Sequence, residues 1–403
     1  MNGLFDSTPP PTRVAALAAI DRVRPAAYAR TRNRLDGAVT GLSPYITHGI
    51  VTLREVLERI DSREPLAVQH KLVFELGWRA YFRHVWQHRG DAILHSLHGG
   101  PRPDASYAAT LPNDIREART GLAVIDEAVR TLYATGGLHN HARMWLASYV
   151  VHLRHVHWRA GADWMIAHLL DGDLASNHLS WQWVAGTSGG RHYLFDAANV
   201  ARNAPPPWHV PDSVLDVPYA TLDRISRDGP PLSALPARAA VPTAEPTLHT
   251  VPPATSAVMT LDSSRPHVAG RAVWLVHPWA LREPPPHVPA GALRIGIYPR
   301  EHHAMWPWTS ARWQWVDAAM RGICETRWLL DSNELAAVLR DAERASTTAD
   351  PHVDRWLPAS VRMHMEPPVF PEVDRHCTSF SQWWKRATRG LRHAHELIRG
   401  ATG

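Results

Sequence analysis

The sequence predicts an α-helical first half followed by a smaller α/β domain. Apolar residues recur with the period of a helix over residues 12–31 and 71–87, and residues 141–157 read as a longer apolar helix. Beyond residue 271, short apolar runs alternate with helical segments, the rhythm of a parallel sheet. A proline-rich stretch separates these patterns. The predicted units are a helical domain over residues 1–203, a linker over 204–265, and an α/β domain over 266–403 that ends in a basic helix.

The helical elements have recognisable boundaries. Thr40-Gly-Leu-Ser43-Pro places two hydroxyls at the start of a helix, where they cap free amides or bind phosphate oxygens. A helix over residues 114–133 is expected to break near Thr120 and Gly121. In the second half we predict strands over 271–277, 293–299 and 326–331, and helices over 309–324, 333–345 and 379–398. Trp383 and Trp384 are the expected docking anchors of the last helix.

The composition bears on the partner of the protein and excludes some types of cofactor site. Lysine plus arginine exceeds aspartate plus glutamate by 43 − 38 = 5, and this basic balance suits a polyanionic partner. Two cysteines, Cys324 and Cys377, cannot ligate a four-cysteine iron–sulfur cluster. The start lacks a signal-peptide core, and no apolar run has the length of a membrane span, so we expect a cytoplasmic protein. We also expect a monomer. His302-His303 lacks further ligands, so we expect packing and no metal.

The most informative stretch runs from Asp171 through Asp173 and Asn177 to Trp181 and Trp183. It sets carboxylates and an amide beside large flat apolar rings, a combination that suits a planar, hydrogen-bonding, redox-active ligand. Upstream, the helical spacing of 140, 143 and 144 places an asparagine, an arginine and a methionine on one face, and the arginine can neutralise a carboxylate such as Asp171.

These motifs resemble the flavin-binding helical domain of the photolyase and cryptochrome family over residues 25–200. The resemblance implies FAD as cofactor. The implied cofactor-binding residues are Tyr28, Thr40, Ser43, Arg79, Arg143, Asp171, Asp173 and Asn177. The chain departs from the family pattern at Val39, which removes a hydroxyl, and at Ala80, which replaces an acidic residue. The family's usual α/β antenna domain precedes the flavin domain, and here the C-terminal α/β unit is a candidate rearranged equivalent. That unit has no glycine fingerprint for phosphate.

The resemblance also implies a lyase activity, the light-driven repair of cyclobutane pyrimidine dimers in DNA by an electron from reduced flavin. Trp78 and Trp183 are the implied stacking walls for the damaged bases. The implied catalytic contacts come from Glu75, Asn140, Met144 and Asn177. The photolyases that repair the six-four photoproduct carry histidines at positions 140 and 144, so their absence here argues against that lesion.

The family's electron relay matches at Trp181 and Trp158. Its third tryptophan aligns with Ala105, and Tyr107 is a candidate substitute. Two alternatives stay open, a cryptochrome-like blue-light sensor without repair activity and a nucleic-acid-binding helical protein that has lost flavin. The retention of Arg143 and Asp171 argues against the second. The sequence leaves open an antenna chromophore, the role of the α/β domain, and whether the DNA is single- or double-stranded.

Overall fold

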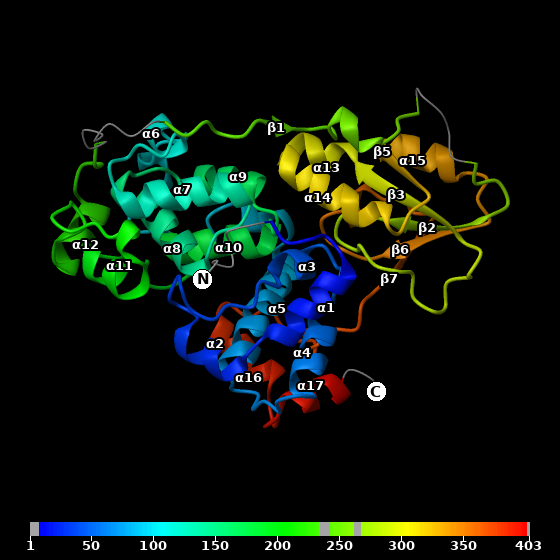
Figure 1. Ribbon diagram of the computed structural model, residues 1–403, viewed down its shortest axis with the longest axis horizontal. Coiled ribbons are helices and arrows are strands. Elements are labelled where there is room, and N and C mark those ends of the chain that lie inside the picture. The colour runs from blue at the N-terminus through cyan, green and yellow to red at the C-terminus, as the bar shows by residue number, and fades with distance from the viewer. Residues whose placement is uncertain (1–7, 234–241, 262–266, 401–403) are drawn as a thin grey trace.

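The computed structural model describes residues 8–233, 242–261 and 267–400 of the chain. A helical body and a parallel sheet with its own helices lie side by side (Figure 1). Parts of the expected linker, residues 234–241 and 262–265, lie outside the described residues. None of the described helices combines the length and apolarity that a membrane crossing requires.

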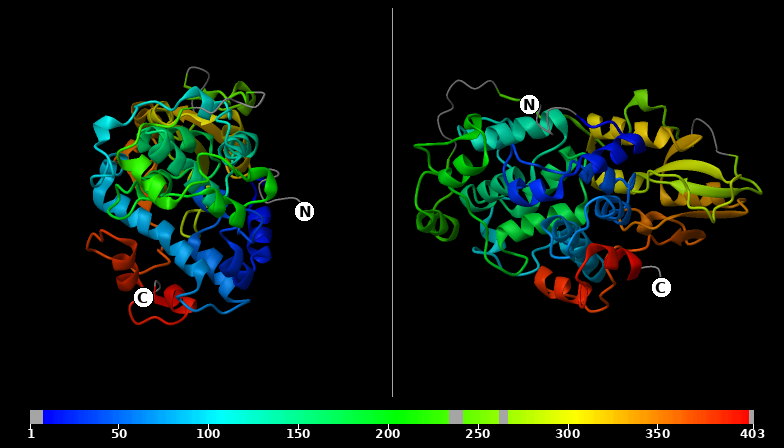
Figure 2. Two further views of the ribbon diagram at one scale, coloured as in Figure 1. Left: turned by 90° about the vertical axis from the view of Figure 1, so that its left-hand side faces the viewer. Right: turned by 60° about the horizontal axis from the view of Figure 1, so that its bottom comes forward.

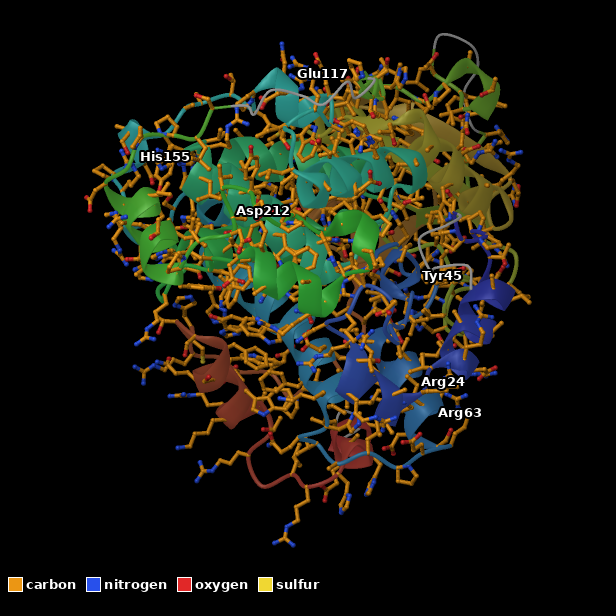
Figure 3. All side chains as sticks on the ribbon, turned by 60° about the vertical axis from the view of Figure 1, so that its left-hand side comes forward. Arg24, Tyr45, Arg63, Glu117, His155 and Asp212 are labelled. Atoms are coloured by element: carbon orange, nitrogen blue, oxygen red, sulfur yellow. The ribbon has the colours of Figure 1, made fainter. Side chains whose placement is uncertain are left out.

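The helical body contains the elements of the first half of the chain. Their bounds are α1 Arg13–Arg22, α2 Pro25–Thr31, α3 Ser43–Thr47, α4 Leu53–Asp61, α5 Lys71–Arg89, α6 Asn113–Arg116, α7 Ala123–Thr135, α8 Asn140–Ser148, α9 Trp158–His168, α10 Leu174–Ala185, α11 Ala197–Asn203 and α12 Tyr219–Arg227. α8 continues into a π-helical turn over Tyr149–Leu153. Exposed arginines such as Arg24 and Arg63 lie on the outside of this body, near α1 and α4 (Figure 3).

Three expectations for the helical body need correction. The single helix expected over residues 12–31 is two helices, because Pro25 opens α2 and has no amide hydrogen to continue α1. The helix expected over 141–157 ends its regular α-helical part at Ser148. The linker is not wholly extended, because α12 forms within it and buries Leu222 against the helical core.

Among the described residues of the second half, a five-stranded parallel sheet has the order β5-β3-β2-β6-β7. The elements of this half are β1 Leu248–His249, β2 Ala272–Val276, β3 Leu293–Pro299, α13 Arg300–Met305, β4 Trp308–Thr309, α14 Ser310–Arg321, β5 Thr326–Leu330, α15 Ser332–Leu339, β6 Arg344–Thr348 and β7 Val361–His364. The predicted helix over 333–345 is wrong at its end, since β6 begins at Arg344. β7 was not predicted, because Val361–His364 alternates too briefly to be distinguished from a loop.

The last helices, α16 Phe380–Ala387 and α17 Ala394–Gly400, leave the sheet and pack on α5 and α4 (Figures 1 and 2). The expected single helix over 379–398 is interrupted by a turn in which Gly390 has a φ of +79°. Trp383 and Trp384 are buried, and Phe74 of α5 meets the Trp384 ring edge-on at 5.1 Å. The end of the chain therefore completes the helical body.

Candidate functional site

A cavity of about 840 Å³ opens within the helical body, between α2, α3, α5, α8 and α10. Its volume falls within the range of small-molecule and cofactor sites, about 300–1,000 Å³. Most of the predicted site residues line it. They are Tyr28, Thr40, Ser43, Glu75, Trp78, Arg79, Asn140, Arg143, Met144, Asp171, Asp173, Asn177 and Trp181.

Arg143 and Asp171 form an ion pair at the edge of the cavity. One guanidinium nitrogen of Arg143 lies 2.9 Å from both carboxylate oxygens, and its Nε donates to the Leu138 carbonyl at 2.8 Å. Burial disfavours the charge of Asp171, but Arg143 and the Ser43 hydroxyl hold its pKa below the ordinary value. The carboxylate is therefore ionised at neutral pH.

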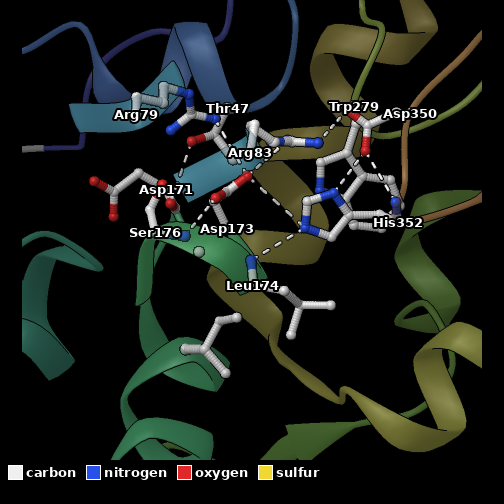
Figure 4. A network of polar contacts seen from close by, with 12 residues as sticks. Thr47, Arg79, Arg83, Asp171, Asp173, Leu174, Ser176, Trp279, Asp350 and His352 are labelled. Atoms are coloured by element: carbon white, nitrogen blue, oxygen red, sulfur yellow. Dashed lines mark hydrogen bonds and ion pairs between the residues drawn. The ribbon is translucent and has the colours of Figure 1, made fainter. Parts of the chain in front are cut away.

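Asp173 is fully buried and lies among three cationic or polar partners (Figure 4). Its Oδ1 accepts from the Ser176 amide at 2.8 Å and so caps α10. Its Oδ2 accepts from Arg83 at 2.7 Å and from Arg79 at 3.4 Å. Burial opposes ionisation, yet Arg83 and Arg79 hold the pKa of Asp173 well below the ordinary value. Arg79 therefore pairs with Asp173, whereas Glu75, four residues earlier on α5, pairs with Arg32.

The residues expected near the cofactor's phosphates, Tyr28, Thr40 and Ser43, line the same cavity. Ser43 opens α3, and Thr40 Oγ1 accepts from the Leu42 amide at 3.4 Å. Burial raises the pKa of Tyr28 above the ordinary value, which keeps its hydroxyl protonated. Asn177 donates from Nδ2 to the Ala162 carbonyl at 2.9 Å.

The residues expected to face the damaged bases share the cavity wall. Glu75 pairs with Arg32, the residue that follows α2, at 3.2 Å. Asn140 and Met144 lie one turn apart on α8, with Nδ2 and Sδ 3.9 Å apart. Trp78 is backed by Phe380 of α16 in a nearly parallel stack, with ring centroids 4.1 Å apart and planes 11° apart. One face of the Trp78 indole is therefore already covered.

Among the residues predicted to contact the flavin or the damaged bases, Trp183 is the one that is absent from the described cavity lining. Its side chain is 39% exposed and lies 5.8 Å from the ring of Tyr193, which does line the cavity. Residues two apart on a helix point in different directions, so Trp181 and Trp183 cannot both face inward. The structure therefore places Trp183 outside the cavity wall, beside Tyr193.

Two of the predicted relay residues, Trp181 and Trp158, lie on helices that pack together, α10 and α9. Trp181 packs so closely against Gly161 that a Cβ there would lie 2.3 Å from the indole. Trp158 lies one turn before Gly161 on α9 and is buried. The His157 ring lies 5.6 Å from Trp158 and 6.2 Å from Tyr107. Tyr107 comes near because residues 107–108 run beside 155–157, where the Ala108 amide donates to the His155 carbonyl.

Sequence reasoning assigned no role to several residues around this site. Arg83 lies one turn beyond Arg79 on α5, a spacing that could have identified it. Ser176 lines the cavity, and its buried Oγ has no hydrogen-bond partner among the described residues, so it can receive a polar group of a ligand. Arg312 and His352 come from the α/β half, and no local pattern points to them.

Comparison with known proteins identifies the ligand class of this cavity. Residues 72–205 match the family model described as the FAD binding domain of DNA photolyase. A cryptochrome DASH of Ostreococcus tauri is 35% identical over 191 residues, which span 45% of this chain and 35% of that protein. A deoxyribodipyrimidine photo-lyase of Streptomyces griseus is 35% identical over 153 residues, 37% of this chain and 32% of that protein. The chain thus spans about a third of the length of these relatives.

A crystal structure of a Synechocystis sp. PCC6803 cryptochrome aligns with a TM-score of 0.43 and 25% identity. The alignment covers 53% of this chain and 45% of that one. Both photolyases and cryptochromes occur among the relatives, so similarity does not separate repair from light sensing. FAD fits this cavity by its volume, by the two ionised carboxylates of Asp171 and Asp173, and by the buried Ser176 hydroxyl that has no hydrogen-bond partner among the described residues.

Proposed function

We propose that this chain, whose helical body carries the FAD-binding domain of the photolyase and cryptochrome family, repairs cyclobutane pyrimidine dimers in DNA. The observation that supports this most directly is the shared cavity. Glu75, Trp78, Asn140 and Met144, expected at the lesion, line the same space as the residues expected at the flavin. Reduced FAD, when bound and illuminated, supplies the electron that opens the dimer.

The flavin-side residues of this chain bind and orient the cofactor. Arg143 and Asp171 neutralise each other, so they present polar atoms to the ring without leaving a net charge. Asp173 offers a buried carboxylate for a hydrogen bond from the ring or the ribose. Asn177 brings an amide in place of a carboxylate, which favours a negatively charged, fully reduced flavin. The phosphates of the cofactor are bound by the hydroxyls of Tyr28, Thr40 and Ser43.

The lesion-side residues hold bases that leave the duplex. Extruding a base costs a few kcal/mol, and a damaged pair costs least. Stacking on an aromatic side chain returns about 1–3 kcal/mol per base. Trp78 can stack bases on the face that Phe380 does not cover, and Glu75 and Asn140 add polar contacts that orient the dimer. The net basic charge of the chain favours DNA as the partner.

A direct assay tests the proposal. Purified protein is reduced, mixed with an oligonucleotide that contains a single thymine dimer, and illuminated with blue light. We expect the dimer to disappear, with no loss in a dark sample. Flavin that bleaches and recovers under light while the dimer persists would refute repair.

That second result is the one expected of a blue-light sensor, the alternative function. The specific observation in its favour is the position of Trp183, which lies beside Tyr193 and outside the cavity wall, so that only one of the two expected stacking surfaces lines the cavity.

A further inference from the structure

The parallel sheet contains the kind of crevice in which α/β proteins hold ligands. The chain moves outward from β2 to β3 and β5, then returns to the other side of β2 to form β6 and β7. In open α/β sheets, ligands bind beyond the carboxyl ends of the strands where the order reverses. Here that point lies between β2 and β6, and the residues that follow these strands include Trp279 and His352.

The helical body occupies this crevice. Arg83 of α5 donates to Asp350 at 3.1 Å with one guanidinium nitrogen and to Asp173 at 2.7 Å with the other (Figure 4). The imidazole of His352 stacks on Trp279, with centroids 4.5 Å apart and planes 5° apart. The same crevice therefore receives the elements that carry the cavity's buried carboxylate.

His352 contacts the first turn of α10 directly. Its Nδ1 lies 2.6 Å from Asp350 Oδ1, and its Nε2 accepts from the Leu174 amide at 3.2 Å. These two contacts fix a neutral imidazole with its proton on Nδ1, and burial lowers the pKa of His352 in agreement. His352 Nε2 then carries no proton, so its 3.9 Å approach to Asp173 is not an ion pair. Its role is to satisfy the free amide that follows Asp173.

Arg312 of α14 holds the other end of the acidic turn, which comprises residues 171–173. Its side chain is buried and donates to the Gly172 carbonyl at 2.7 Å and to the Ile166 carbonyl at 3.1 Å. The guanidinium also lies over the Trp308 ring at 4.2 Å. A Cβ at position 172 would lie 2.4 Å from Arg312 Nη1 and 2.8 Å from the Ile166 carbonyl, so this approach requires glycine.

We propose that the C-terminal α/β unit is part of the flavin site, with Arg312 and His352 as positioning residues for the acidic turn and the start of α10. They act through Asp171 and Asp173, so the proposal rests on the assignment of those carboxylates to FAD. The crevice of the sheet is thus filled by side chains that contact the flavin-binding half of the chain.

The test measures FAD binding and does not depend on DNA repair activity. Arg312→Met removes both carbonyl contacts, and Arg312→Lys retains the charge and can keep one of them. His352→Phe keeps the stack on Trp279 but leaves the Leu174 amide without an acceptor, whereas His352→Gln can restore the acceptor. The matched control is Arg321→Met, on the same helix, where the arginine side chain is 59% exposed. Each full-length variant is titrated with FAD, and the visible circular dichroism of the bound flavin is recorded.

We expect Arg312→Met and His352→Phe to weaken FAD binding about 10- to 100-fold, the effect of leaving buried groups unsatisfied. Arg312→Lys and His352→Gln should recover part of the affinity, and Arg321→Met should match the wild type. The flavin's circular dichroism should change in both disruptive variants, because the carboxylates beside the ring move. If Arg312→Met fails to fold, the His352 pair gives the same comparison.

Wild-type affinity and an unchanged dichroism spectrum in both disruptive variants would overturn the inference. A loss of affinity that the conservative variants do not recover, with the dichroism unchanged, would also overturn it, since that outcome indicates general destabilisation. A wild-type protein that binds FAD but repairs no dimers would refute the proposed activity alone.

Discussion

The Arg143–Asp171 pair gives the sharpest test of how the cavity holds FAD. Asp171→Asn keeps the shape of the side chain and removes its charge, leaving Arg143 with the Leu138 carbonyl. Breaking a buried, hydrogen-bonded ion pair by removing one partner costs about 3–5 kcal/mol. The lower end applies here, because a quarter of the Arg143 side chain remains exposed. In the empty cavity water can solvate the freed guanidinium, whereas bound FAD excludes that water.

Most of the cost therefore falls on the bound state, and about 3 kcal/mol corresponds to roughly a 100-fold loss of FAD affinity. Titration of the apoprotein with FAD, followed by flavin fluorescence, measures the dissociation constant. Asp36→Asn is the matched control, since Asp36 pairs with Arg34 on the surface, where such pairs contribute about 0–1 kcal/mol. A dissociation constant for Asp171→Asn within threefold of the wild type would refute the reasoning.

Three further outcomes are expected. Trp78→Ala should weaken binding of dimer-containing DNA by about 1–3 kcal/mol while FAD stays bound, and equal affinity for damaged DNA in a gel-shift titration would contradict a stacking role. Gly161→Ala should displace the Trp181 ring, because a Cβ at position 161 would lie 2.3 Å from it. We expect slower flavin photoreduction and a lower melting temperature. An unchanged photoreduction rate would dismiss Trp181 as the first relay residue. Stability should fall as pH decreases from 6.5 towards 4, because burial lowers the pKa of His277 to about 4 while the unfolded chain takes up the proton near 6.5. One such histidine accounts for about 2 kcal/mol between pH 7 and pH 5, so equal urea midpoints at these two pH values would exclude it.

The sequence predicted the parts of the site that depend on local pattern. The helix over 71–87 matches α5, and the spacing of residues 140, 143 and 144 places their side chains on one face of α8 that lines the cavity. Arg143 and Asp171 meet as expected, because their motifs lie within a short stretch of chain. Local periodicity carries this information, since a helical repeat reports which side chains share a face.

Contacts between residues far apart in the sequence leave no local pattern of this kind. Arg83 and Asp350 lie 267 positions apart, and Leu174 and His352 lie 178 apart. Nothing near Asp350 or His352 distinguishes them from the other acidic and histidine residues of a chain with 26 histidines. The same limit explains why the stack of Phe380 on Trp78 was not foreseen, since it requires the end of the chain to return to α5.

Arg83 connects the two halves of the chain through a single guanidinium. Asp173 is buried and the Asp350 side chain is only 14% exposed, so burial alone would raise the pKa of each. Both pKa values are instead held below the ordinary range, in large part by Arg83, which donates to one carboxylate from each half. Without the α/β unit, Arg83 would lose one anion and the Leu174 amide would lose its acceptor at the same time. The geometry of Asp173 is therefore determined jointly by the helical body and the sheet, although the residues that line the cavity all come from the first half of the chain.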